Sequence, residues 1–284
     1  MGGIELLKPN ELQHLNSGEC ADIYEVDSST VLKLGKVGWS RDLLYQEYLN
    51  GRIVSDCGIP APGVYDFVEI DERYGYTMEK LKDLPLMDMM WKRPWMVVSY
   101  ARAMAEIHAK IHSARADKGL PELTEKYRDF IGEKKSISDE VKRLLFLELD
   151  ELSGKGDECI CHGDFHPINI LVDGKRYYVI DWVLATRGDP RADVAGTYLI
   201  TRTYSSCMRE QGRIKSFISA VGGRIISKIY LDRYISITGM ERKEIMRWIP
   251  IRAATYLDVG LPEKLENAFH KIVDEHYGAM SKHS

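Results

Sequence analysis

The segment from residue 159 to residue 195 constrains the fold of this chain most strongly. Three short β-like runs follow one another there, Cys159–Cys161, Ile170–Val172 and Tyr177–Ile180. The loops that join them are dense in His, Asp, Asn, Pro and Gly, whereas the flanking sequence has helical spacing of its apolar residues. The sequence therefore predicts a strand–loop–strand unit inside a mainly helical region, with polar side chains on its loops.

The first third of the chain has a different pattern. A helix is predicted over residues 39–54, and a polar loop, Asn16-Ser17-Gly18-Glu19, is expected before the first strand. Four runs rich in β-forming residues predict two hairpins: Asp22–Val26, Thr30–Leu34, Val64–Ile70 and Tyr74–Glu79.

Strand signals stop near Leu81, and helical spacing dominates the remainder. We therefore predict an α+β fold with two lobes. Residues 1–81 form a small antiparallel β-rich lobe with one helix, and residues 82–284 form a larger, mainly helical lobe. The cleft between two such lobes is the expected place for a small ligand.

Composition excludes several classes of protein. The 284 residues include 39 Lys and Arg against 43 Asp and Glu, a net charge of −4, which argues against a strongly basic nucleic-acid binder. No apolar run reaches the roughly 18 residues that span a bilayer, and the N-terminus lacks the pattern of a secretory signal. Five cysteines without a disulfide pattern indicate a cytoplasmic protein. No feature indicates a nucleic-acid, membrane or obligate protein partner.

The loops of the 159–195 segment carry three oxygen-bearing side chains, Asp164, Asn169 and Asp181. The first two are five residues apart and the last two are twelve apart. Mg²⁺ takes oxygen ligands, and phosphoryl transfer needs such ligands together with a carboxylate that orients the acceptor hydroxyl. The order Asp, Asn, Asp matches the order of these roles in protein kinases.

At this point the sequence resembles a known family. His162-Gly163-Asp164, followed by Asn169 and Ile180-Asp181-Trp182, is similar to the motifs of the aminoglycoside phosphotransferase and choline kinase family. Asp189–Ala195 resembles the motif that follows them in that family, and the resemblance extends over roughly residues 15–195. It implies a protein-kinase-like fold and a small-molecule kinase.

The resemblance implies a role for each matching residue. Asp164 corresponds to the catalytic base, and Asn169 and Asp181 correspond to the Mg²⁺ ligands. Lys33 corresponds to the lysine that contacts the α- and β-phosphates, and Glu47 corresponds to its ion-pair partner.

Further nucleotide contacts follow from the same resemblance. Ser17 and Gly18 are expected to contact phosphate, although only one glycine stands where the glycine-rich motif has three. Backbone groups of Glu79 and Leu81 are expected to face adenine at the hinge between the lobes. Asp193 is expected to hydrogen-bond the backbone of the catalytic loop.

The resemblance implies ATP or GTP as the phosphoryl donor, bound with Mg²⁺. The acceptor would be a small molecule with a hydroxyl group, of the aminoglycoside, choline, sugar or amino-alcohol type. Only seven residues separate Asp181 from Asp189-Pro190, which is too short for the activation segment of a protein kinase. A catalytically inactive nucleotide-binding scaffold is the main alternative, and a protein kinase is a weaker one.

The acceptor site is expected in front of Asp164, lined from the stretch 187–213 and from the last helices, including Asp258 and Glu263. Because that stretch contains five arginines, an anionic or neutral acceptor suits it as well as a cationic one. These arginines equally suit a solvated surface. They are Arg187, Arg191, Arg202, Arg209 and Arg213.

Two metal-like patterns remain. Cys159, Cys161, His162 and His166 suggest a zinc cluster, but the spacing is not that of a structural zinc site, and Cys-x-Cys on a strand favours two thiols in the core. His108 and His112 are four residues apart on a helix, and we expect packing and surface roles for them.

Overall fold

A computed structural model gives the fold of the chain. It describes residues 11–18, 20–81, 84–115, 119–154, 158–204 and 213–278. The strands are β1 (Gln13–Ser17), β2 (Ala21–Glu25), β3 (Thr30–Gly35), β4 (Val64–Ile70), β5 (Arg73–Glu79), β6 (Leu84–Pro85), β7 (Cys159–Cys161), β8 (Ile170–Asp173), β9 (Arg176–Val179) and β10 (Thr186–Gly188).

Helices account for most of the second part of the chain. They are α1 (Arg41–Asp56), α2 (Leu86–Lys92), α3 (Val97–His112), α4 (Leu123–Gly132), α5 (Asp139–Leu152), α6 (Pro190–Tyr204), α7 (Arg213–Thr238), α8 (Arg242–Met246), α9 (Ile249–Thr255) and α10 (Glu263–Tyr277), with the 3₁₀ turns η2 (Pro94–Met96) and η3 (Trp182–Leu184). No helix in these described ranges is long and apolar enough to cross a membrane.

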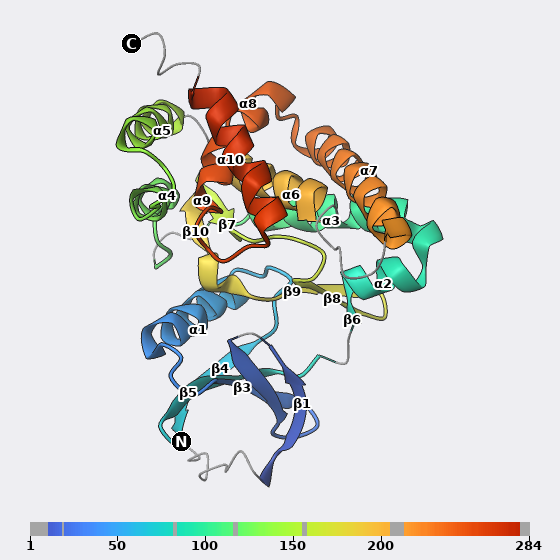
Figure 1. Cartoon of the computed structure of the whole chain (residues 1–284). Coiled ribbons are helices and arrows are strands. Elements are labelled where there is room, and N and C mark those ends of the chain that lie inside the picture. Colours follow the sequence, from blue (N-terminus) through green and yellow to red (C-terminus); the bar gives the residue numbers. More distant parts are fainter. Residues whose placement is uncertain are drawn as a thin grey trace.

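The two-lobed α+β architecture is as the sequence predicts. A five-stranded antiparallel sheet in the order β1-β2-β3-β5-β4 forms the small lobe, with α1 as its helix. Figure 1 shows this sheet and α1 below the helices of the larger lobe, with β6, β8 and β9 between them. The strand–loop–strand unit thus faces the small lobe.

One prediction in the small lobe is wrong. The stretch before the first hairpin is not simply a loop, because β1 includes Asn16 and Ser17 and pairs antiparallel with β2. All five residues of β1 are exposed, so the strand has no apolar alternation that would reveal it in the sequence. Backbone pairing with β2 holds this strand in place, because its exposed side chains are not packed in the core.

The helices of the large lobe bury one face each, as their spacing predicts. In α10, Leu265, Phe269, Val273 and Tyr277 recur every four residues and are buried. The start of α5 is fixed by Ser138, whose hydroxyl accepts a hydrogen bond from the backbone of Val141. The buried faces meet in one continuous core, which supports the strand–loop–strand unit from behind.

Candidate active site

The loop after β7 is fixed by a buried carboxylate. Asp193, in the first turn of α6, accepts hydrogen bonds from the backbone N–H groups of His162 (2.5 Å) and Gly163 (3.0 Å). This is the contact expected for Asp193. Burial opposes ionisation of this carboxyl, but its interactions with His108 and His112 hold its pKa well below the usual range.

Gly163 is required by the path of this loop. Its φ of +84° is a left-handed conformation, and a Cβ atom there would lie 2.6 Å from the backbone oxygen of Leu184. Its carbonyl accepts a hydrogen bond of 2.8 Å from the guanidinium of Arg252. The position of Gly163 is therefore fixed by the close approach of Leu184 and by the hydrogen bond from Arg252.

Asp164 lies in a positively charged environment. His166 Nε2 is 3.3 Å from Asp164 Oδ2, and the Nδ1 atom of His166 is buried without a partner among the described residues. Burial by itself raises the pKa of Asp164. The hydrogen bond from His166 and the nearby charges of His166, His162 and Arg252 outweigh burial, and the pKa lies below its usual value. Asp164 is thus a carboxylate at neutral pH.

The strand pair β8–β9 brings the other two predicted residues together. Ile170 pairs with Val179, and the Ile180 N–H donates to the Asn169 carbonyl at 3.0 Å, so Asn169 and Asp181 lie at the same end of the ladder. The side-chain amide of Asn169 donates to the Asp164 carbonyl at 3.0 Å. That bond leaves the oxygen Oδ1 of Asn169 as a ligand for a cation.

Asp181 has a backbone conformation that non-glycine residues seldom adopt, with φ 69° and ψ 63°. Such strain is concentrated at functional sites, where the surrounding structure holds it. The turn η3 follows directly, and the Trp182 indole fixes it by donating to the Val179 carbonyl at 2.9 Å.

In the small lobe, Lys33 of β3 and Glu47 of α1 form an ion pair of 2.5 Å, as the resemblance implies. The Tyr76 hydroxyl donates to the same Glu47 oxygen at 3.0 Å. Burial opposes the charge on Lys33, yet the carboxylates of Glu47 and Asp181 raise its pKa above the usual value. Asp181 of the large lobe therefore favours the charged form of Lys33 in the small lobe.

A buried amide links the two lobes directly. Asn50 of α1 lies three residues after Glu47 and is fully buried. Its Nδ2 atom donates to the Trp182 carbonyl at 2.8 Å, and its Oδ1 atom accepts from Gln46 at 2.8 Å. The helix that positions Lys33 therefore also holds the turn that carries Asp181.

Arg252 of α9 holds the loop that carries Asp164. Its guanidinium is buried and donates to the Gly163 carbonyl and to the hydroxyls of Tyr127 (2.8 Å) and Tyr256 (2.7 Å). Both tyrosine rings lie about 5 Å from it. Its close neighbour on α6 is Gly196, where a Cβ atom would lie 2.5 Å from the Arg252 Nε atom.

The expectation of packing and surface roles for His108 and His112 is only partly right. Both are almost fully buried, and both Nε2 atoms lie within hydrogen-bond distance of Asp193 Oδ2, at 3.0 and 3.3 Å. Their Nδ1 atoms face the hydroxyls of Tyr230 and Tyr234, each at 2.6 Å. The two imidazoles therefore position the carboxylate that positions the catalytic loop.

The thiols of Cys159 and Cys161 are buried on one face of β7, 3.9 Å apart, as a core position predicts. Among the described residues, they form a possible metal-ligand group with His112 and not with His162 or His166. Because His112 already has hydrogen-bond partners on both ring nitrogens, its contacts are complete without a metal. His166 lies against Asp164 instead.

The remaining predicted nucleotide contacts lie in the small lobe. The Ser17 hydroxyl donates to Asp22 at 2.6 Å, and the Gly18 N–H donates to the Ala21 carbonyl at 2.8 Å, which closes the turn between β1 and β2. Glu79 gives its N–H to the Gly63 carbonyl, so an adenine contact there would use its carbonyl oxygen. Leu81 lies two residues after the end of β5.

Two of the five arginines expected near the acceptor site are paired with acids. Arg187 pairs with Glu158 at 2.6 Å, and Arg191 pairs with Asp189. Arg209 lies outside the described residues. Asp258, another candidate, accepts a hydrogen bond from the Ser136 N–H at 2.9 Å and lies three residues after the end of α9. Among the described residues, Asp164 is hydrogen-bonded or ion-paired to none of these side chains, and they stay candidates for the acceptor site.

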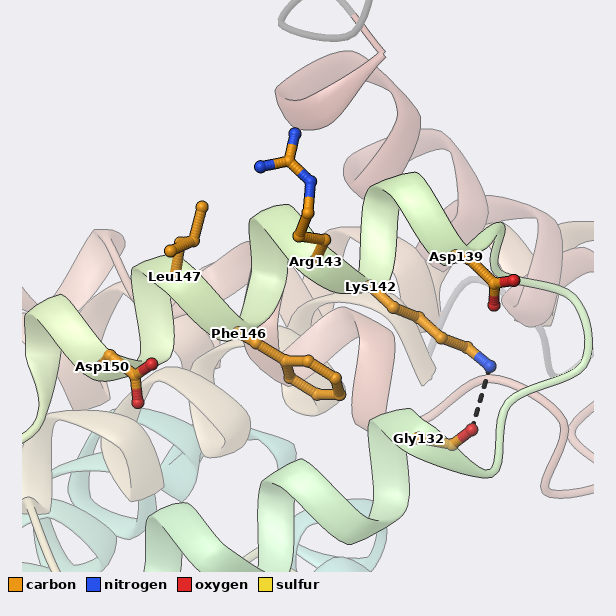
Figure 2. A pocket seen from close by; sticks show the side chains of 7 residues that line it. All are labelled: Gly132, Asp139, Lys142, Arg143, Phe146, Leu147 and Asp150. Atoms are coloured by element: carbon orange, nitrogen blue, oxygen red, sulfur yellow. Dashed lines mark hydrogen bonds between the residues drawn. The ribbon is translucent and has the colours of Figure 1, made fainter.

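The hollow drawn in Figure 2 is separate from this site. It is lined by residues of α5 and by Gly132 at the end of α4, and includes none of the predicted site residues. The Lys142 ammonium crosses it to the Gly132 carbonyl at 2.9 Å. In Figure 1, α5 lies at the outer edge of the large lobe, away from β8 and β9.

A family model described as the phosphotransferase enzyme family matches residues 11–216, which is most of the chain. The chain belongs to this family. The match includes the whole strand–loop–strand unit and the Lys33–Glu47 pair, and it confirms the family expected from the motifs.

A curated protein is similar to part of this chain. A curated relative, acyl-CoA dehydrogenase family member 11 of Mus musculus, is 26% identical over 152 residues, which is 52% of this chain but 17% of the relative. The chain therefore matches only about a sixth of the length of the curated relatives.

Solved structures show the same fold. A choline/ethanolamine kinase family protein from Mesorhizobium loti is 12% identical with a TM-score of 0.59, covering 94% of this chain and 87% of its own. An ADP-bound aminoglycoside phosphotransferase is 18% identical with a TM-score of 0.55, covering 95% and 92%. At these identities the likeness demonstrates the fold alone, which is the predicted protein-kinase-like fold.

Sequence reasoning did not identify several residues of this candidate site. Asn50 could have been found from its helical i+3 spacing to Glu47. His166 could have been found because it lies two residues after Asp164. Arg252 and Tyr127 had none, because they are distant from the motifs in the chain and meet Gly163 only through packing.

Proposed function

We propose that this phosphotransferase transfers the γ-phosphoryl group of ATP or GTP to a hydroxyl group of a small molecule. In this proposal, residues 1–81 bind the nucleotide and residues 82–284 supply the catalytic loop and the acceptor site. The enzyme would act in the cytoplasm, with Asp164 as its catalytic base.

The residues present fit a magnesium-bound nucleotide. Asn169 and Asp181 offer an amide oxygen and a carboxylate, which are the hard ligands that Mg²⁺ prefers. Lys33, held by Glu47, would contact the phosphates, and Ser17, Gly18, Glu79 and Leu81 would complete the nucleotide site. When bound, the metal supplies neutralisation of phosphate charge.

The chain's own groups would position the acceptor. The Asp164 carboxylate would orient the acceptor hydroxyl and take its proton as the oxygen attacks phosphorus. His166 and Arg252 would keep Asp164 deprotonated, and Asp193 would keep the loop in place. Positioning and charge stabilisation account for most of the rate in this class of reaction.

The observation that carries this proposal is that α1 holds both Lys33, through Glu47, and the turn after Asp181, through Asn50. Lys33 is ion-paired with Glu47 and lies within the field of Asp181, which Asn50 holds through the adjacent turn. An active kinase needs these parts together. Their joint presence favours an enzyme over an inactive scaffold.

A small acceptor is favoured by the chain between Asp181 and Asp189. Its seven residues form η3 and the strand β10, which pairs with β7. A peptide-docking activation segment would need a longer stretch there.

The test measures release of the nucleoside diphosphate, ADP or GDP, from ATP or GTP in the presence of Mg²⁺, over a panel of hydroxylated acceptors. The panel should contain aminoglycosides, choline, homoserine, sugars and a hydroxyacyl-CoA, the last because the curated relatives are named for acyl-CoA. We expect acceptor-dependent release that falls by about 10³-fold in Asp164→Asn, in the range of general-base removal.

A matched control is Asp274→Asn, on the exposed face of α10, which should keep wild-type release. Nucleotide binding without Asp164-dependent release for any acceptor would favour the scaffold. Equal release by Asp164→Asn and wild type would refute the assignment of the base.

A further inference from the structure

Tyr76 is a buried tyrosine of β5 whose hydroxyl meets the ion pair of the small lobe. Its hydroxyl oxygen lies 3.0 Å from Glu47 Oε1, and the same carboxylate oxygen lies 2.5 Å from Lys33 Nζ. Because a carboxylate oxygen has two lone pairs, it can accept from both groups at once. The two donors therefore share one oxygen, and together they fix where the Glu47 carboxylate lies.

The register of the sheet brings Tyr76 to this position. Lys33 of β3 and Tyr76 of β5 are direct partners in the antiparallel strand pair, so their side chains project from the same face of the sheet. The Lys33 Nζ atom lies 6.0 Å from the centre of the Tyr76 ring, within the range at which an aromatic ring attracts an ammonium group. Tyr76 thus lies beside Lys33 and also holds the carboxylate that pairs with it.

Tyr76 is a rigid donor at neutral pH. Burial, followed by the negative charge of Glu47, raises the pKa of Tyr76 well above its usual value, so the hydroxyl keeps its proton. Its ring lies 6.1 Å from the ring of Tyr48 on α1, which adds a contact between the strand and the helix. A lysine has a flexible four-carbon stem, whereas a tyrosine has two side-chain torsions. The position of the Lys33 ammonium group therefore depends on its more rigid neighbours.

We infer that Tyr76 is a positioning residue, which holds Lys33 through Glu47 at the place where the ammonium group contacts the phosphates of the nucleotide. This inference rests on the proposed function, in which Lys33 binds the phosphates. Tyr76→Phe removes the hydroxyl and keeps the ring, so the backbone of β5, including the expected adenine contact at Glu79, stays in place. The loss should therefore concern the phosphates and not the nucleoside.

The experiment separates phosphate binding from nucleoside binding. Non-hydrolysable analogues of ATP and GTP are titrated with Mg²⁺ into wild type and Tyr76→Phe, beside adenosine and guanosine, and dissociation constants are measured by calorimetry. We expect Tyr76→Phe to bind the triphosphate analogue about ten-fold more weakly, in the range of one hydrogen bond to a charged group, and to bind the nucleoside like wild type. Tyr74→Phe removes a hydroxyl from the same face of the same strand and should bind both like wild type.

A double-mutant cycle shows whether the effect passes through Lys33. Lys33→Met should weaken binding of the analogue, and the addition of Tyr76→Phe should cause no further loss. An equal loss for nucleoside and analogue in Tyr76→Phe, or additive losses in the double variant, would overturn the inference.

Two outcomes distinguish this inference from the proposed function. A loss in Lys33→Met without a loss in Tyr76→Phe would overturn the role of Tyr76 alone, and the nucleotide site would stand. Unchanged affinity for both analogues in Lys33→Met would refute the phosphate-binding role of Lys33, and the role of Tyr76 would fail with it.

Discussion

At the scale of single residues, the catalytic loop depends on Arg252 and Gly163. Gly163 has a left-handed backbone conformation, and its carbonyl accepts a hydrogen bond from Arg252. A planar guanidinium reaches this carbonyl and two hydroxyls at once, and the absence of a side chain at Gly196 makes room for it. The pattern of charges in the sequence gives no hint of this arrangement.

We therefore expect Arg252→Lys to be damaging although it keeps the charge. An ammonium cannot replace the three directed hydrogen bonds, and loss of one or two bonds to a charged group costs about 2–4 kcal/mol. Urea unfolding of the variant and wild type measures this change in the free energy of unfolding. A difference below about 0.5 kcal/mol would show that the contacts to Gly163 and the tyrosines are dispensable.

At the scale of elements, α1 and η3 act as a coupled pair. Glu47 on α1 holds Lys33, and Asn50, one turn later, holds the carbonyl of Trp182 next to Asp181. A single helix thus sets the distance between the predicted phosphate-binding lysine and a predicted metal ligand. Rotation of α1 would disturb both together.

Asn50→Asp tests this coupling with almost no change of shape. A carboxylate cannot donate to the Trp182 carbonyl and would repel it, so the turn carrying Asp181 should loosen. We expect the apparent affinity for Mg²⁺ to fall about ten-fold, corresponding to the loss of roughly one hydrogen bond. Gln46→Ala, which removes only the donor to Asn50 Oδ1, is the milder control. An unchanged magnesium dependence in Asn50→Asp would separate α1 from the metal site.

At the scale of the whole molecule, Asp193 joins elements from distant parts of the chain. It lies on α6, accepts from the loop after β7 and from two histidines of α3, and these reach the tyrosines of α7. The active-site loop is thereby connected to the centre of the large-lobe core. Acid should weaken this connection.

His108 gives the sign of the pH dependence. Burial, followed by the charge of His112, lowers the pKa of His108 from 6.5 to about 3, although Asp193 opposes this. Between those values the unfolded chain binds a proton that the folded chain does not, so the free energy of unfolding falls as pH falls. Asp193 acts in the same direction at lower pH, because its pKa is depressed on folding.

We expect the free energy of unfolding of wild type to fall more steeply between pH 6 and 4 than that of His108→Gln. The difference in slope should be about 1.4 kcal/mol per pH unit, the value for one proton. Denaturant unfolding at several pH values measures both slopes. Parallel curves for the two proteins would contradict a neutral, buried His108.

The sequence alone determined the order of the elements and the motifs of the family. Apolar spacing located most helices and strands, and the fixed intervals from Asp164 to Asn169 and Asp181 identified the loop, because these residues are close in the chain. The sequence also paired Lys33 with Glu47, through the resemblance. The exposed strand β1 was not predicted, because its sequence has no alternation of apolar residues.

Only the tertiary structure decided which distant side chains support that loop. Arg252 lies 89 residues from Gly163 in the chain, and Asn50 lies 132 residues from Trp182, yet both contacts are within 2.8 Å. His108 and His112 have the spacing of any buried helix face, and their partner Asp193 is 85 and 81 residues away. Local spacing predicts neighbours along one element. Contacts between elements depend on how their buried faces pack, and that is decided by the fold as a whole.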